Sequence, residues 1–317
     1  MKNSVFPWGH NGRYNDYSAF LKKEFNQKIQ KISVNAGFSC PNRDGKLSKK
    51  GCIYCNNDAF SPDYCKKKTS ITEQIDDGIS FFSKKYASMK YLAYFQFYTN
   101  TYAPLPELKK KYEEALSHPK IIGLVIGTRP DCINDDMLNY LEELSKKCYL
   151  MIEFGVESVN DSTLKRINRG HLFADSVKAI EETSKRKIHN CAHLILGLPG
   201  EEESDFLEQA RVVSSLPVEN LKLHQLQIHK GTVIAKEYAA HPEDFNLFSM
   251  EEYLDIVVRY IELLNPDIVL ERFVSQAPSE WLIAPRWGVK NYVFTDKIKK
   301  ILRERDTWQG KLYKKLN

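Results

Sequence analysis

The chain has 317 residues and a net charge of +5, with 42% hydrophobic and 27% charged residues. This composition is typical of a globular protein with one large core or two modest ones. No apolar run is long enough to span a membrane, and the N-terminus lacks an apolar signal region. Because the chain also has an odd number of cysteines, seven, we expect a cytoplasmic protein with no membrane partner and with free or metal-bound thiols.

Basic residues are concentrated near both ends of the chain. Residues 22–50 and 297–317 each carry eight lysines and arginines against two acidic residues. Such a charge favours the binding of phosphate groups. The alternative is a solvated lysine-rich surface that binds no ligand.

Apolar periodicity predicts strands and helices that alternate along the chain. The predicted strands are residues 32–37, 91–98, 121–127, 149–156, 188–197, 221–228 and 268–271. The predicted helices are residues 15–28, 70–87, 104–118, 134–147, 161–168, 173–186, 202–215, 250–264 and 296–305. Asn134 is expected to cap the helix at 134–147.

The first six strands predict an α/β fold with a parallel sheet and right-handed crossovers. Six strand–helix units are too few to close an eight-stranded barrel, so we expect an open, partial (β/α)6 TIM-like barrel. Residues 1–230 would form this barrel with its lead-in, and residues 231–317 would form a C-terminal α+β appendage facing substrate or RNA. Functional groups in such barrels lie at the C-terminal ends of the strands.

Three cysteines lie in the loop after the first strand. Cys40, Cys52 and Cys55 have the spacing C-x11-C-x2-C. Three thiolates leave one iron of a four-iron cluster without a protein ligand, and an open metal position can bind a substrate or cofactor directly. The alternatives are a zinc ion with a distant fourth ligand, and loop cysteines without metal.

Polar residues follow the second and third strands. Thr99 and Asn100 can present donors to a carboxylate, or they can cap the next helix. Arg129 and Asp131 flank a rigid proline, and they can form an anion clamp or a structural ion pair. The mouth of the barrel is therefore expected to bind polar or anionic groups.

The fourth strand carries two glutamates, Glu153 and Glu157. They are four residues apart, so both should point to the barrel interior, where they suit a cationic or hydroxyl-bearing ligand. The alternative is a buried ion network with Arg129 or Arg169 and no ligand.

The fifth and sixth strands also end in candidate site residues. His193 and Gly197 belong to the fifth strand, where glycines allow a ligand to approach the backbone closely. His224 and Gln225, near the end of the sixth strand, are predicted to contact substrate.

The C-terminal region contains Trp281, Arg286 and Trp287 in an aperiodic loop beside a basic helix. Aromatic rings and arginine planes stack on unpaired RNA bases, so this loop is a candidate RNA-binding surface. Packing of the two tryptophans onto the barrel is the alternative.

The four remaining cysteines lack the spacing of metal ligands. Cys148 and Cys191 are interpreted as core thiols. The roles of Cys65 and Cys132 are left open.

Several motifs together resemble the radical S-adenosylmethionine (SAM) proteins of the YhcC/YtqA type, which include the MnmL tRNA-modifying enzymes. The motifs are NAGFSCPNRDG (35–45), GCIYCN (51–56), GTRPD (127–131), GVESVN (155–160), RGH (169–171), GLPG (197–200), APRWG (284–288) and DTWQG (306–310). The chain is also similar to the radical SAM half of the elongator catalytic subunit. The resemblance spans nearly the whole chain.

This resemblance implies a 4Fe-4S cluster on Cys40, Cys52 and Cys55, with SAM bound to the open iron. The residues that would contact SAM are Tyr54, Thr99, Asn100, Glu157, Ser158, Arg169, His193 and Gly197. The residues that would contact substrate or RNA are Arg43, Arg129, Asp131, His224, Gln225, Trp281, Arg286 and Trp287.

The implied activity uses a 5′-deoxyadenosyl radical to convert 5-carboxymethylaminomethyluridine to 5-aminomethyluridine at the wobble position of tRNA. The implied partners are tRNA and an electron donor such as flavodoxin or ferredoxin. Two alternatives remain: a radical SAM enzyme acting on a non-RNA substrate, and a non-enzymatic zinc-containing RNA-binding protein.

Overall fold

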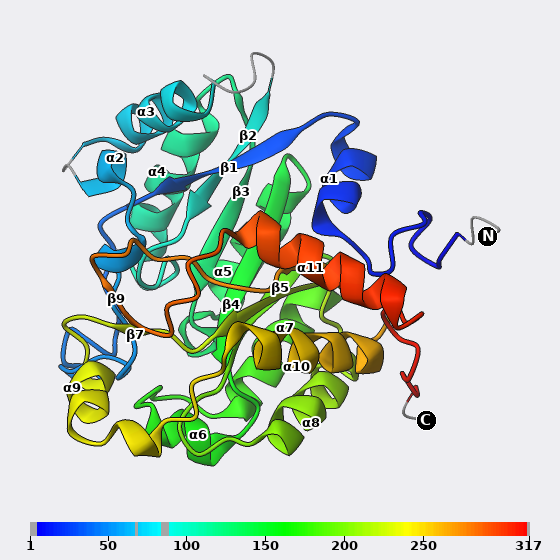
Figure 1. The fold of residues 1–317 in the computed structure, drawn as a ribbon. Helices are drawn as coiled ribbons and strands as arrows, with labels where there is room; N and C mark the ends of the chain where they lie inside the picture. The colour runs from blue at the N-terminus through cyan, green and yellow to red at the C-terminus, as the bar shows by residue number, and fades with distance from the viewer. Residues whose placement is uncertain (1–4, 67–68, 84–88, 316–317) are drawn as a thin grey trace.

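The structure, a computed structural model, describes residues 5–66, 69–83 and 89–315 (Figure 1). Seven parallel strands form one sheet in the order β1-β2-β3-β4-β5-β6-β8. Their bounds are β1 Ile29–Val34, β2 Lys90–Phe95, β3 Ile121–Thr128, β4 Tyr149–Glu157, β5 His189–Leu196, β6 Asn220–Gln225 and β8 Val269–Arg272. The helices are α1 Tyr17–Phe25, α2 Asp63–Lys66, α3 Ile71–Ser83, α4 Leu105–Leu116, α5 Asp135–Ser145, α6 Asp161–Arg166, α7 Phe173–Lys185, α8 Glu203–Ser214, α9 Val233–Ala240, α10 Met250–Leu263 and α11 Asn291–Glu304.

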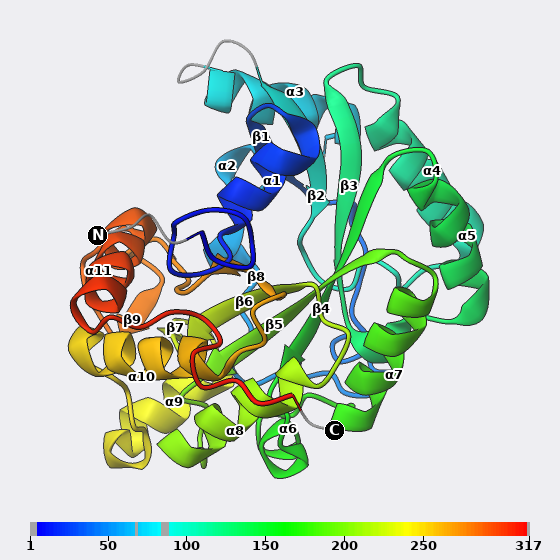
Figure 2. The same cartoon turned by 90° about the vertical axis from the view of Figure 1, so that its right-hand side faces the viewer.

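The sheet curls into a half-barrel, with helices such as α4, α5 and α7 around its outer face (Figure 2). The predicted partial barrel is confirmed, but its sheet has seven strands rather than six. The seventh strand, β8, comes from the C-terminal region and pairs with β6, where Asn220 lies opposite Val269. The strand predicted at 268–271 therefore lies in the barrel sheet, while the division of the chain at residue 230 stays a prediction.

The remaining elements differ from the predictions mainly at their ends. The strand predicted at 221–228 stops at Gln225, and Ile228–His229 (β7) pairs antiparallel with Leu282–Ala284 (β9) instead. The last helix starts at Asn291, five residues earlier than predicted, and α9 is not predicted at all. The end of the helix predicted at 70–87 lies outside the described residues.

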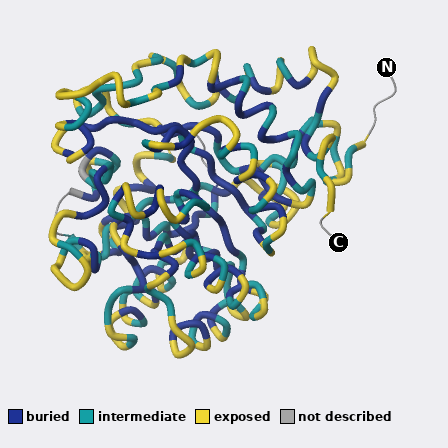
Figure 3. The backbone as a smooth tube through the Cα atoms, turned by 90° about the horizontal axis from the view of Figure 1, so that it is seen from below, coloured by how far each residue is buried: buried dark blue, intermediate teal, exposed yellow. Residues whose placement is uncertain are grey.

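Burial on both faces explains why the sequences of the central strands are continuous apolar runs. Leu124, Val125 and Ile126 in β3 are fully buried, because helices cover the outer face and side chains of other strands fill the interior. Figure 3 shows buried backbone through the middle of the molecule and exposed backbone at its rim. Asn134 caps α5 as predicted, since its Oδ1 accepts the Met137 N–H at 2.9 Å. No helix in the described part of the chain is long and apolar enough to cross a membrane.

Gln309 fastens the C-terminal segment to two other parts of the chain. Its side-chain oxygen accepts the Asn15 N–H at 2.9 Å, and its amide donates to the carbonyls of Asn265 and Ile268, each at 2.8 Å. Gln309 is buried. One side chain therefore satisfies three backbone groups on the lead-in segment and on the connection between α10 and β8.

We predict that Gln309→Ala lowers the free energy of unfolding by about 2–4 kcal/mol, because buried backbone groups lose their partners. Urea unfolding measures this change. The matched control is Gln27→Ala at an exposed position, expected to change stability by less than about 0.5 kcal/mol. Equal effects of the two variants would contradict the role given to Gln309.

Candidate active site

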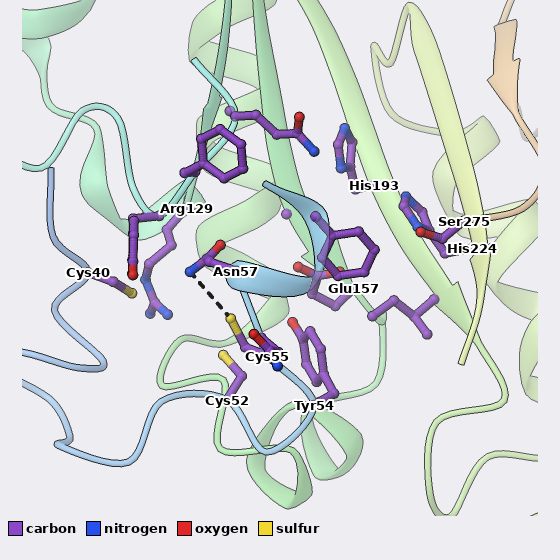
Figure 4. Close-up of a pocket in the computed structure, with 18 of the residues that line it drawn as sticks. Cys40, Cys52, Tyr54, Cys55, Asn57, Arg129, Glu157, His193, His224 and Ser275 are labelled. Atoms are coloured by element: carbon purple, nitrogen blue, oxygen red, sulfur yellow. Dashed lines mark hydrogen bonds between the residues drawn. The ribbon is translucent and has the colours of Figure 1, made fainter. Parts of the chain in front are cut away.

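A pocket opens at the C-terminal ends of the strands, where partial barrels place their functional groups. Its lining includes all three cysteines of the loop after β1. Figure 4 shows Cys40, Cys52 and Cys55 toward one end of this pocket and His193 and His224 toward the other. The pocket therefore has a thiol end and an inner end formed by β5, β6 and β8.

The thiol end presents three free cysteines together with side-chain donors. Asn42 Nδ2 lies 3.4 Å from Cys52 Sγ, and Arg169 Nη1 lies 3.6 Å from the same sulfur. Burial, reinforced by the neighbouring Cys52, raises the pKa of the Cys55 thiol to about 11. A bound metal is what would make such a thiol a thiolate at neutral pH.

The backbone of the loop aims these cysteines at one space. The Arg43 N–H donates to the Cys40 carbonyl at 2.8 Å, and the Cys55 N–H donates to the Cys52 carbonyl at 3.1 Å. Arg43 lies among the eleven residues between Cys40 and Cys52, and its guanidinium donates to the Cys55 carbonyl at 2.7 Å. Arg43, predicted to contact RNA, is thus also a brace between the two halves of the loop.

Two arginines behind the thiols are held by internal partners. Arg129 donates to both oxygens of Asp131 at 2.9 and 2.8 Å and to the Arg169 carbonyl at 2.7 Å. This is the structural ion pair that the sequence left as an alternative to an anion clamp. Arg169 donates to the Gly155 carbonyl at 2.5 Å and lies 3.6 Å from Glu157, while its Nε has no partner in the described chain.

Glu157 faces the pocket from an unusual backbone conformation. A bulge at the end of β4 gives it a φ of 69°, in the left-handed region that a non-glycine residue rarely adopts. Burial, followed by the charge of Glu157, holds the pKa of Tyr54 well above its ordinary range. Glu157 and Tyr54 therefore lie close together beside the thiol end.

Glu153 belongs to a buried ion cluster rather than to a ligand site of its own. Its Oε1 accepts from Lys31 at 2.7 Å and from Lys222 at 2.6 Å, and both lysines also pair with Glu271. Burial opposes ionisation, but the charges of Lys222 and Lys31 prevail and hold the pKa of Glu153 well below its usual value. The alternative of an ion network is thus realised: lysines pair with Glu153, and Arg169 lies 3.6 Å from Glu157 as predicted.

The inner end of the pocket continues this cluster. His193 Nε2 lies 3.0 Å from Glu153 Oε2, and the His193 and His224 rings lie 5.8 Å apart. Arg272 donates to His224 Nε2 at 2.8 Å. Burial and the charge of Arg272 hold the pKa of His224 well below its usual value, so the ring is neutral and can accept this hydrogen bond.

Several buried polar atoms of the lining have no partner in the described chain. They are Thr99 Oγ1, Arg169 Nε, Gln227 Oε1, both ring nitrogens of His229 and Arg272 Nε. Buried polar groups are rarely left without a partner. Their presence in the lining makes this pocket suited to a polar ligand.

Some predicted site residues lie outside the pocket. Asn100 donates to the carbonyls of Phe95 and Gly127, and the Ser158 hydroxyl donates to Glu201. Gly197 has a φ of 91° and packs against Phe248. Direct contacts of these three residues with SAM are therefore not supported by their positions, because each is engaged in holding a strand end or turn.

The C-terminal candidates also lie outside this pocket. Trp287 stacks on Phe294 at 5.9 Å and donates to the Phe248 carbonyl at 3.0 Å, so it packs the C-terminal loop onto α10 and α11. Arg286 is exposed and lines an adjoining cavity with Trp287. Trp281 lies next to β9, where its carbonyl accepts the Lys230 N–H. Asp131, another predicted contact, also lies outside the pocket, and its carboxylate accepts two hydrogen bonds from Arg129.

The other cysteines have ordinary positions. Cys191 is fully buried in one core cluster, and Cys148 packs against the main core cluster, so both are core thiols as predicted. The Cys65 thiol donates to the Ser33 carbonyl at 3.1 Å, and burial raises its pKa to about 12. Cys132 lines a separate cavity with Asp131.

Arg272, Gln227 and His229 line the pocket but are not among the predicted site residues, although Gln227 and His229 are expected at or near the end of the sixth strand. Arg272 ends β8, so the rule that strand ends carry function would have found it had this strand been assigned to the barrel. Gln227 and His229 lie just beyond β6, and their side chains could not be told from capping or core residues by spacing.

Comparison with known proteins identifies the class. The chain matches the model of the radical SAM superfamily over residues 40–213 and that of the radical SAM C-terminal domain over residues 218–304. The protein therefore belongs to the radical SAM superfamily, as its motifs predict. It is 35% identical to YtqA of Bacillus subtilis over 318 residues, 100% of this chain and 98% of YtqA. It is also 35% identical to YhcC of Escherichia coli over 291 residues, 92% of each chain.

A more distant relative and a solved structure share part of this likeness. The tRNA uridine(34) acetyltransferase of Methanocaldococcus infernus is 24% identical over 163 residues, 50% of this chain and 29% of that protein. The structure of Methanocaldococcus infernus Elp3 matches with a TM-score of 0.65 at 15% identity, covering 89% of this chain and 64% of that one. The chain thus spans less than two thirds of that Elp3 chain, and the likeness shows a common fold.

Radical SAM proteins imply a 4Fe-4S cluster and SAM, and the pocket fits both groups. Three thiols with nearby amide and guanidinium donors suit a cluster whose sulfur carries negative charge. The unpartnered Thr99 Oγ1 and Arg169 Nε suit the polar groups of a nucleoside cofactor. A possible metal group of Glu153, Cys191 and His193 is explained otherwise, because the two lysines already hold the Glu153 carboxylate.

We predict that Glu153→Gln destabilises the protein by about 3–5 kcal/mol, because it leaves Lys31 and Lys222 buried with insufficient negative charge. Urea unfolding measures the loss. In the matched control Glu143→Gln, an exposed carboxylate paired with Lys146 is removed, and no measurable change is expected. If Glu153→Gln left the free energy of unfolding unchanged, the ion cluster would not stabilise the barrel.

We predict a pH-dependent effect of Glu201→Gln. Burial raises the pKa of Glu201 to about 7, against hydrogen bonds from Ser158 and Thr163 that lower it. Because the folded pKa exceeds the unfolded one, the wild type loses stability as pH rises from about 4.5 to about 7. The variant should therefore match the wild type at pH 4 and exceed it by roughly 3 kcal/mol above pH 7. Urea unfolding across this pH range measures the difference in stability, with Glu208→Gln on the exposed face of α8 as control. If the difference between Glu201→Gln and the wild type did not change with pH, the raised pKa of Glu201 would be refuted.

Proposed function

We propose that this radical SAM enzyme modifies tRNA, converting 5-carboxymethylaminomethyluridine at the wobble position to 5-aminomethyluridine. The carboxymethyl CH2 would lose a hydrogen atom to the 5′-deoxyadenosyl radical and one electron to the electron donor protein, and water would hydrolyse the resulting imine to 5-aminomethyluridine and glyoxylate. The observation that carries the proposal is a single pocket with three thiols at one end and unpaired polar and cationic groups at the other. Such a pocket can hold a cofactor and a substrate next to each other, which the transfer of a hydrogen atom requires.

At the thiol end, Cys40, Cys52 and Cys55 are the proposed ligands of the cluster. Tyr54, Glu157 and Arg169 line the pocket near this end and are proposed contacts of SAM, as is Thr99, whose N–H donates to the Ser39 carbonyl beside Cys40. His193, toward the other end of the pocket in Figure 4, is a further proposed contact. When bound, the cluster and SAM supply a 5′-deoxyadenosyl radical. The protein's own part is to orient SAM and substrate and to exclude water from them.

Access for an RNA base is supported by a second cavity. It is lined by Arg286, Trp287 and Lys290, and it shares Gln225, Gln227 and Ser275 with the main pocket. A flipped base could enter beside these residues, because enzymes that act on a base take it out of its stack. The wall of this cavity is mainly apolar and carries the cations Arg286 and Lys290, which suits the flat face of a base and the phosphates beside it.

Charge and relatives support tRNA as the partner. The loop that carries the cysteines is basic, with Arg43, Lys46, Lys49 and Lys50, and the C-terminal segment 297–317 is basic as well. The relative from Methanocaldococcus infernus is by its name an enzyme of tRNA uridine 34. The proposed electron donor is a flavodoxin or ferredoxin.

We predict that a strain lacking the gene accumulates 5-carboxymethylaminomethyluridine and lacks 5-aminomethyluridine in its tRNA. The wild-type gene should restore the product, whereas Cys40→Ala should not, because it removes a cluster ligand. Mass spectrometry of tRNA nucleosides measures both compounds.

The matched control is Cys148→Ala, which removes a thiol outside the pocket and should restore the product. Iron content of the purified proteins provides a second readout, with a loss expected only for Cys40→Ala. If tRNA from the deletion strain is unchanged while iron is lost from Cys40→Ala, the enzyme acts on a non-RNA substrate.

A further inference from the structure

The ion cluster at the inner end of the pocket has more positive than negative charge. Its cations are Lys31, Lys222 and Arg272, and its carboxylates are those of Glu153 and Glu271. His193 and His224 add no charge, because burial and the neighbouring cations lower their pKa values. One positive charge in this cluster therefore lacks a counter-charge.

The charge in excess is that of Arg272. The carboxylate of Glu153 is shared by Lys31 and Lys222, and that of Glu271 by the same two lysines. Arg272 makes no ion pair within the ranges that the structure describes, and it donates only to the neutral His224 ring. Its Nε is buried without a partner. Arg272 is half-buried and lacks a counter-charge, so the arrangement is one that a bound anion would complete.

Arg272 is also placed to receive a ligand. It lines the main pocket at the end of β8, together with His224 and Ser275. The hydrogen bond from Nη2 to His224 at 2.8 Å orients the guanidinium, and its remaining Nη hydrogens have no partner in the described chain. A planar guanidinium with a free edge suits a carboxylate, which can accept two parallel hydrogen bonds.

We propose that Arg272, oriented by His224, binds the carboxylate of the substrate and thereby selects a substrate with a negatively charged group. This inference rests on the proposed function, in which the carboxymethyl group of the modified uridine is the anion. SAM also carries a carboxylate, but in the proposed arrangement that group belongs to the thiol end, whereas His224 lies toward the opposite end of the pocket (Figure 4).

The test compares two tRNAs that differ only in the carboxymethyl group: one carries 5-carboxymethylaminomethyluridine and the other 5-aminomethyluridine. The dissociation constants of both are measured for the cluster-loaded wild type, Arg272→Gln and Arg272→Lys. The wild type should prefer the first tRNA about tenfold or more, since a charge-assisted pair is lost with the second. Arg272→Gln should bind both equally, and Arg272→Lys should keep part of the preference.

The ratio of the two dissociation constants separates recognition of the carboxylate from structural damage, because a distorted pocket weakens the binding of both tRNAs alike. Arg211→Gln, an exposed arginine paired with Glu208, is the matched control and should keep the full preference. A full preference in Arg272→Gln overturns the inference and leaves the proposed function intact. If Arg272→Gln instead loses its affinity for SAM tenfold or more, the carboxylate bound there is that of SAM, and the assignment to substrate is overturned.

A second probe does not depend on tRNA. N-methylglycine carries the same amino-carboxylate group, and its amide lacks the charge. Calorimetry should detect binding of N-methylglycine to the wild type but not to Arg272→Gln. The amide should bind to neither protein. If the wild type binds neither tRNA but binds N-methylglycine, the proposed function fails while the anion site stands; if N-methylglycine does not bind, the anion site is refuted.

Discussion

The half-barrel depends on a set of ion pairs between lysines and glutamates in its interior. An open sheet has two edge strands, here β1 and β8, which no backbone hydrogen bond joins. Lys31 on β1 pairs with Glu271 on β8 at 2.7 Å, so side chains connect the two edges across the interior. Glu153 on β4 and Lys222 on β6 tie this pair to the central strands. The same charges that hold the sheet curled also set the electrostatics of the pocket.

This arrangement divides the pocket by chemistry. One end offers the thiols and the Asn42 amide of the loop after β1 together with the Arg169 guanidinium, and it suits a metal cluster and the nucleoside cofactor of the radical SAM family. The inner end offers the unpaired Arg272 and neutral histidines, and it suits an anionic group. Because both ends share one lining, a ligand at either end lies next to a ligand at the other.

Local sequence signals predicted the half-barrel and the cysteine loop, because apolar runs and cysteine spacing act over a few residues. They did not place β8 in the sheet, since a four-residue strand is too short to show a periodicity of its own. Nor could they tell whether a polar residue at a strand end faces the pocket. Asn100 and Ser158 turn to neighbouring backbone and to Glu201, whereas Thr99 and Glu157 face the cavity. Such choices depend on contacts between distant segments.

The most direct test of the account is an anaerobic reaction of the cluster-loaded protein with SAM, dithionite and tRNA from a strain that lacks the gene. In this reaction 5-carboxymethylaminomethyluridine should disappear while 5-aminomethyluridine and 5′-deoxyadenosine appear together. Release of 5′-deoxyadenosine with no change in the tRNA nucleosides would contradict it.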